Sequence, residues 1–310
     1  MTSISGTHRH SIDLLRFVAS FGIVWAHMLN PQPIAAIGYA ALAIFLMMVP
    51  FLSVRFYEER ARRTQEGAPR VPRRRYRLSR RMSRLLLPWL FWSAFYKLLL
   101  VAQSGDLRSL FTITDPWSLL VGPSIHLWFL PFIFVLSGFA IVAPQVLRNR
   151  NSVIVGSVLA FLVSMPVMWL HDTGDLVVPL AQWAFGLPPF LYGLLLAFGI
   201  RFRVAWAPVA FFVATAVLSW LRGAEYWPAH YVLAVLIFAL AWKYEIKSTS
   251  FQKLGALAYG IYLIHPFFMA IWYHFAGFGQ NTFLGIFVVF TLASIATAIM
   301  RRLPYLRALV

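Results

Sequence analysis

Long apolar runs separated by short polar segments make up most of the sequence. Each run is near the roughly 20 residues that an α-helix needs to cross the hydrocarbon core of a bilayer. The runs cover residues 11–30, 34–55, 85–103, 124–144, 152–170, 181–200, 205–221, 228–243, 253–275 and 282–300. A membrane β-barrel would instead show alternating segments of about ten residues. The pattern therefore predicts an all-α, polytopic transmembrane helix bundle with about ten spans.

The composition also indicates a membrane protein. Of the 310 residues, 60% are hydrophobic and 12% are charged, whereas a soluble domain is about half apolar and about a quarter charged. The chain has no cysteine, which excludes disulfides and thiolate metal sites, and its ten acidic residues give little support to a metal centre. The polar N-terminus and the lack of a small-residue cleavage site predict that 11–30 stays as the first span. We expect residues 1–310 to form one membrane domain.

The positive charges predict the orientation. With the N-terminus in the cytoplasm, 23 of the 27 Lys and Arg residues fall on the cytoplasmic side, and only Lys97, Arg108 and Arg222 fall on the outer side. Cytoplasmic loops of membrane proteins are enriched in these residues. We therefore expect both termini to be cytoplasmic. This topology accounts for the net charge of +17 without a nucleic-acid partner.

Two of the predicted connections are long. The cytoplasmic loop 56–84 is rich in arginine, and the outer loop 104–123 carries Asp106 and Asp115 and leads into His126. The sequence has no convincing internal repeat, which weakens the case for a transporter built from paired halves. It also lacks a nucleophile elbow, a Walker loop, an HExxH motif and a dinucleotide fingerprint.

The first span carries ionisable residues that a bilayer does not readily accept. Asp13, Arg16 and His27 lie in the run 11–30. His27 follows Arg16 by eleven positions, which is about 16 Å along a helix and close to three turns. Both side chains therefore share one face. The pair predicts a functional site with a cation near the cytoplasm and an imidazole near the outer leaflet. Alternatively, Arg16 reaches toward the cytoplasmic interface and His27 caps the outer end of the helix.

Arginines recur at the entrance to the third span. Arg77, Arg80, Arg81 and Arg84 are three or four residues apart, which places several guanidinium groups on one helical face. Such a face is suited to bidentate recognition of phosphate. Binding to anionic lipid headgroups explains the same pattern.

Two further segments hold polar residues near or within spans. His126 and Trp128 lie in HLWFL, and Tyr262 and His265 lie in YGIYLIHP. Each has a simpler interpretation. Trp128 fits the aromatic belt at the membrane interface, and His265 fits a packed, hydrogen-bonded membrane histidine.

Four segments together resemble the acyltransferase-3 family of bacterial membrane proteins, which transfer acyl groups to extracytoplasmic carbohydrates. They are IDLLRFVASFGIVWAHM, RRMSRLLLP, HLWFL and YGIYLIHP, in the order found in that family and spread over nearly the whole chain. One departure is the second span, 34–55, which lacks the family's phenylalanine-rich segment ending in Ser-Gly-Phe.

The resemblance implies a substrate pair and a location. The donor is acyl-CoA on the cytoplasmic side, most often acetyl-CoA, although a succinyl donor stays open. No permanently bound cofactor and no metal is implied. The acceptor is a hydroxyl of a polysaccharide, an oligosaccharide or a lipid-linked saccharide. The protein is expected to lie among the lipids of the bacterial cytoplasmic (inner) membrane as a multi-pass protein.

The resemblance also assigns roles to the residues singled out above. Catalytic roles go to His27, Arg16 and Asp13, donor binding goes to Arg77, Arg80, Arg81 and Arg84, and supporting roles go to His126, Trp128, Tyr262 and His265. His27 acts either as a general base or as the carrier of an acyl-imidazole. Two rival functions remain open, namely a small transporter or flippase for a lipid-linked saccharide and a structural or signalling membrane protein.

Overall fold

A computed structural model describes residues 9–29, 33–65, 78–110, 117–246, 248–279 and 282–310. Within these residues the secondary structure is helical and has no β-strand, which confirms the all-α prediction. The α-helices are α1 (His10–Leu29), α2 (Ala36–Gln65), α3 (Leu78–Ser104), α4 (Ser118–Val121), α5 (Phe129–Val146), α6 (Arg150–Asp172), α7 (Leu180–Arg201), α8 (Trp206–Leu221), α9 (Trp227–Lys243), α10 (Thr249–Gly255), α11 (Ala258–Ala276) and α12 (Thr282–Arg302). The short 3₁₀ helices are η1 (Pro33–Ala35), η2 (Leu107–Leu110), η3 (Ile125–Trp128) and η4 (Leu306–Leu309).

Several helices are long and apolar enough to cross a membrane. In the described part of the chain there are seven of them: α1, α2, α3, η3 continued by α5, α6, α7 and α12. The count becomes eight if α10 and α11 form one broken span. Helices α8 and α9 are apolar but have only 16 and 17 residues. The prediction of an all-α chain with several helices able to span a membrane is therefore confirmed, whereas the count of about ten spans and the cytoplasmic termini stay predictions.

The run 253–275, predicted as one helix, is broken into α10 and α11, which meet at 45°. Gly255 ends α10 directly against α1, where an added Cβ would lie 2.6 Å from the carbonyl oxygen of Asp13. Arg301 of α12 donates a hydrogen bond of 2.9 Å to the carbonyl oxygen of Ala256 at the break. A broken membrane helix needs such partners, because its freed backbone groups find no water in the bilayer core.

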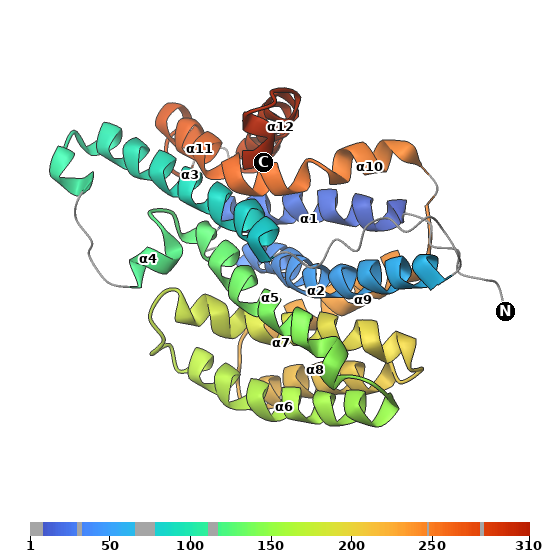
Figure 1. Cartoon of the computed structure of the whole chain (residues 1–310). Helices are drawn as coiled ribbons and strands as arrows, with labels where there is room; N and C mark the ends of the chain where they lie inside the picture. The colour runs from blue at the N-terminus through green and yellow to red at the C-terminus, as the bar shows by residue number, and fades with distance from the viewer. Residues whose placement is uncertain (1–8, 30–32, 66–77, 111–116, 247, 280–281) are drawn as a thin grey trace.

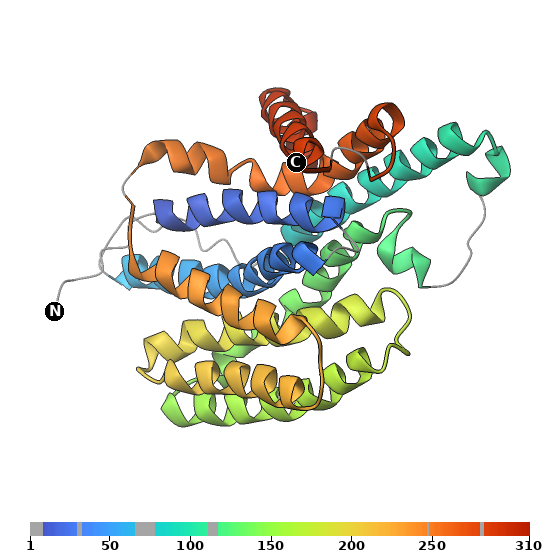
Figure 2. The ribbon, with the colours of Figure 1, turned by 180° about the vertical axis from the view of Figure 1, so that it is seen from behind.

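The helices form layers around a central group. In both views α1, α2 and α9 lie between α6–α8 on one side and α10–α12 on the other (Figure 1, Figure 2). The C-terminal end of α1 and the α6–α7 and α8–α9 connections lie at the end of the bundle opposite the N-terminus. Helix α7 is the most enclosed span, with 78% of its apolar window buried against 22–28% for α3, α6 and α12. The latter three therefore present most of their surface to lipid.

Glycines set the closest helix contacts. A Cβ on Gly193 of α7 would lie 2.0 Å from the carbonyl oxygen of Met47 in α2, and a Cβ on Gly38 of α2 would lie 2.4 Å from that of Gly22 in α1. Apolar side chains gain little by packing together in lipid, so membrane helices associate through close backbone approach at small residues. These contacts hold α1 and α7 against α2.

The Gly193 contact predicts a stability difference between two glycine substitutions. Gly193→Ala places a methyl group against the backbone of α2, so we expect the free energy of unfolding to fall by about 1–3 kcal/mol. Gly138→Ala in α5 is the matched control, because a Cβ there meets no atom within 4 Å. Thermal unfolding of both variants in detergent measures the difference. Equal stability of the two variants would contradict the central role of the α2–α7 contact.

Candidate active site

Helix α1 is continuous from His10 to Leu29, so Arg16 and His27 lie on one helix at the predicted spacing. Asp13 is buried, and its Oδ1 lies 3.7 Å from Nη1 of Arg16. Arg16 therefore has the acidic partner that a charge inside a span requires. Asp13 faces α10 at Gly255, and His27 faces α11 at His265. The broken α10–α11 segment thus follows α1 along the length that separates Arg16 from His27.

Three histidines from three separate elements meet near the C-terminal end of α1. The ring centroids of His27 and His265 are 5.1 Å apart, and those of His126 and His265 are 5.4 Å apart. His126 and His265 are buried and His27 is half-buried. His265 of α11 therefore lies between His27 of α1 and His126 of η3. The structure brings together three residues that are 99 and 139 positions apart in sequence.

The backbone of α11 determines which nitrogen of His265 carries the proton. Its Nδ1 lies 2.8 Å from the carbonyl oxygen of Tyr262 and 3.3 Å from that of Ile261. A carbonyl oxygen only accepts hydrogen bonds, so Nδ1 is the donor. In the neutral ring, Nε2 then keeps its lone pair. This Nε2 is buried and has no hydrogen-bond partner among the described residues.

Tyrosines hold the loop of His126 against α11. The hydroxyl of Tyr262 donates to the carbonyl oxygen of His126, and the hydroxyl of Tyr96 in α3 donates to that of Leu263 over 2.7 Å. The Nδ1 of His126 lies 2.8 Å from Oγ of Ser124, while its Nε2 is buried and unpartnered within the described part of the chain. These bonds satisfy backbone groups that would otherwise be costly to bury and orient the ring of His126.

The histidine cluster is suited to proton transfer. A neutral imidazole nitrogen with a free lone pair is a base that accepts a proton from a hydroxyl brought within hydrogen-bond distance of it. Two of the three rings offer an Nε2 that is not engaged with the described residues. In the same residues, no three His, Cys, Asp or Glu side chains are arranged to hold a metal ion.

The remaining predicted site residues lie elsewhere or are not described. Trp128 is buried, and its described ring contacts are with Phe129 and Phe132, 6.1 and 5.5 Å away between centroids. Arg84 is exposed on α3, and its carbonyl oxygen lies 3.4 Å from the hydroxyl of Tyr259.

The other members of the predicted donor-binding cluster cannot be placed. Arg77 lies outside the described residues. Arg80 and Arg81 lie in the first turn of α3, and their side chains are outside the described part. Phosphate binding by the four arginines therefore stays a prediction.

Sequence reasoning missed three residues of the site. Tyr96 lies in an aromatic stretch of α3 where nothing in the pattern separates it from core tyrosines. Ser124 precedes η3 and becomes notable only through its contact with His126. Arg301 is, by its sequence position, one of the 23 basic residues predicted on the cytoplasmic side, and only the structure shows that it bonds to the α10–α11 break. Each is revealed by a tertiary contact and carries no local signal.

The structure combines a bundle of apolar, membrane-span-capable helices with a cluster of imidazoles at one end of α1. A family model described as an acyltransferase domain matches residues 9–301. The chain belongs to the acyltransferase-3 family, and it is an O-acyltransferase. No curated protein and no solved structure matches it.

The hydroxyl of Tyr262 can be tested by removing it. Tyr262→Phe leaves the buried carbonyl of His126 without its donor, so we expect the free energy of unfolding to fall by about 1–3 kcal/mol and acyl transfer to slow. Tyr273→Phe makes the same change on the same helix, at a hydroxyl with no hydrogen bond to the described residues. Thermal unfolding and acyl transfer should be measured for both. A Tyr262→Phe variant that matches Tyr273→Phe in both would show that Tyr262 does not position the site.

Proposed function

We propose that this acyltransferase moves an acetyl group from cytoplasmic acetyl-CoA to a hydroxyl of a carbohydrate on the outer side of the bacterial inner membrane. The observation that carries the proposal is the position of His27. It lies in contact with His265 at one end of α1, on the same helix as the Arg16–Asp13 pair. The family supports acyl transfer, and the charge pattern of the sequence predicts that His27 lies toward the outer side.

The distance along α1 addresses the main physical problem of such a reaction. The nucleotide of acyl-CoA is too polar to cross the bilayer core, whereas its pantetheine arm is long and thin. In this proposal, Arg16 and the cluster of Arg77, Arg80, Arg81 and Arg84 hold the nucleotide phosphates near the cytoplasm. The arm then extends along α1 over the distance from Arg16 to His27, about 16 Å. The thioester thus reaches the histidines without transfer of the whole donor.

The reaction at His27 is an acyl transfer with one proton to move. His27 takes the proton from the acceptor hydroxyl as its oxygen attacks the thioester carbonyl. The C–O bond forms, the C–S bond breaks, and the proton passes from His27 to the departing thiolate of CoA. His265 supports this step, because its Nε2 lone pair lies on an imidazole in contact with His27. In the alternative route, His27 first accepts the acyl group and then passes it to the hydroxyl.

Substitution of His27 tests the proposal. His27→Ala should lower acyl transfer by about 10²–10⁴-fold, since the general base is lost. His274→Ala is the control, because His274 is an exposed histidine in the last turn of α11 and should keep full activity. The measurement is transfer of label from [¹⁴C]acetyl-CoA to the host cell's glycans by the purified protein. Label retained on the wild-type protein without acceptor, and absent from His27→Ala, would select the acyl-imidazole route.

Two outcomes would contradict the proposal. The first is full transfer by a folded His27→Ala variant. The second is movement of a lipid-linked saccharide across the membrane without consumption of acyl-CoA, which would indicate a flippase.

A further inference from the structure

An open cavity of about 510 Å³ lies at the surface, outside the histidine cluster and between the C-terminal end of α6 and the α8–α9 connection. Its lining comes from Trp169 and residues 171–173 of the α6 end, from residues 222–225 and from Trp227 at the start of α9. The volume is in the range of small-molecule sites, which usually combine aromatic walls with a few placed polar groups. The α6–α7 and α8–α9 connections lie at the same end of the bundle as the C-terminal end of α1 (Figure 1, Figure 2).

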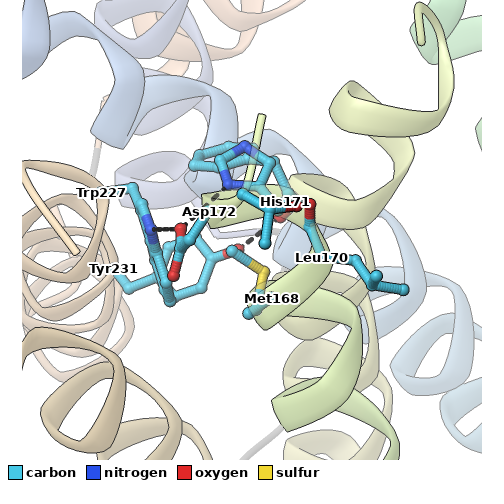
Figure 3. Close-up of polar contacts among 8 residues, drawn as sticks. Met168, Leu170, His171, Asp172, Trp227 and Tyr231 are labelled. Carbon is cyan, nitrogen blue, oxygen red and sulfur yellow. Dashed lines mark hydrogen bonds and ion pairs between the residues drawn. The ribbon is translucent and has the colours of Figure 1, made fainter. Parts of the chain in front are cut away.

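Two tryptophans contribute to the walls of this cavity, and each is held by a polar neighbour. Trp227 is buried, and its indole N–H donates a hydrogen bond of 2.7 Å to Oδ1 of Asp172. The same Oδ1 lies 3.3 Å from Nδ1 of His171, so Asp172 joins α6 to α9 (Figure 3). Trp169 is 54% exposed, and the guanidinium of Arg222 lies 5.5 Å from the centre of its ring. An exposed indole is thereby kept in place beside the cavity.

The polar groups of the cavity retain hydrogen-bonding capacity. Oδ2 of Asp172 makes no hydrogen bond with the described residues, although Oδ1 is engaged. Arg222 and Glu225 both line the cavity, and within the described part of the chain they do not pair with each other. One cation and two carboxylates in a small space favour a ligand that both donates and accepts hydrogen bonds. A ligand with a single negative charge would instead meet two like charges.

Contacts through α2 and α9 connect the cavity to the end of α1 that carries His27. Trp227 lies one turn before His230 on α9, and the ring of His230 stacks on Tyr39 of α2 at 6.0 Å. The neighbour of Tyr39, Gly38, packs against Ala26, which precedes His27. The cavity and the histidines therefore belong to the same end of the bundle but lie on different helices. A ligand that occupies both the cavity and the histidine cluster must therefore be an extended molecule of several linked units.

We propose that this cavity is a subsite for one sugar unit of the acceptor chain, separate from the unit that is acylated at His27. The inference rests on the proposed function, since it assigns the acceptor as an oligosaccharide or polysaccharide. A sugar ring has hydroxyls that donate and accept, which suits Asp172, Arg222 and Glu225. It also has an apolar C–H face that packs on an indole such as Trp169.

The subsite predicts that acceptor length matters at Trp169. For Trp169→Ala we expect the KM for long acceptor fragments to rise about tenfold, the usual scale for the loss of one aromatic contact, with kcat unchanged. The KM for single-sugar acceptors should not change. The probes are fragments of graded length from the surface polysaccharide of a host strain that lacks this chain. Glu225→Gln provides a second variant at an exposed side chain, and it should raise the KM for the same long fragments.

Trp206→Ala is the matched control, because Trp206 is equally exposed (56%) but begins α8, away from the cavity. Binding of the same fragments to the protein in nanodiscs, without acyl-CoA, separates the two proposals. If long fragments bind to the wild-type protein more tightly than to Trp169→Ala, but the wild-type protein transfers no acyl group, the proposed function is contradicted and the subsite is supported.

Two results would overturn the subsite. The first is that the wild-type protein transfers acyl groups, while the Trp169→Ala and Trp206→Ala variants have the same KM for long fragments. The other is loss of a co-purified phospholipid from Trp169→Ala in native mass spectrometry, with fragment binding unchanged, which would assign the cavity to a lipid headgroup.

Discussion

Contact between α1 and its neighbours through glycines is the constraint on which the site depends. Gly38 of α2 approaches the backbone of Gly22 in α1. Gly255 of α10 approaches the backbone of Asp13, which is also in α1. Neither position has room for a Cβ. Because close backbone approach replaces the hydrophobic driving force in lipid, these glycines determine where α1 lies. The position of α1 then sets where Arg16 and His27 lie against α10 and α11.

The polar groups of the site meet the second demand of the bilayer, which is that buried donors and acceptors find partners within the protein. Asp13 pairs with Arg16, Arg301 bonds to the break before α11, and Tyr262 bonds to the backbone of His126. The imidazole Nε2 atoms of His126 and His265 are two of several exceptions among the described residues, and they are the two in the histidine cluster. Buried polar atoms without partners are costly, so their presence beside His27 is consistent with a site that hydrogen-bonds its substrate.

Much of the fold could be predicted from the sequence because the signals are local. Apolar runs of the right length predicted the membrane helices, and the spacing of Arg16 and His27 predicted their shared helix. The break at Ala256 could not be predicted, since Gly255 packs there against Asp13, more than 240 residues away in sequence. The same limit applies to Tyr96, whose role depends on a bond to Leu263. The helices α8 and α9 agree with the predicted runs, but their length alone does not establish that they span the membrane.

The candidate site was predicted in part. The motif resemblance selected His27, His126, Tyr262 and His265, and the structure brings these four together. It also selected Trp128, which packs with Phe132 in the core. Residue type and spacing identify the elements that carry a site, but the direction of each side chain depends on tertiary packing. The cavity beside Trp169 carried no motif and became visible only once α6 and α9 were placed together.

Transfer across a sealed membrane tests the central claim most directly. The purified protein is placed in vesicles, labelled acetyl-CoA is confined to the side that carries the α5–α6 connection, and the glycan acceptor is confined to the other side. The account predicts labelled glycan on the far side while labelled acetyl-CoA stays where it was supplied. Labelled glycan that forms only when donor and acceptor share one side would contradict it.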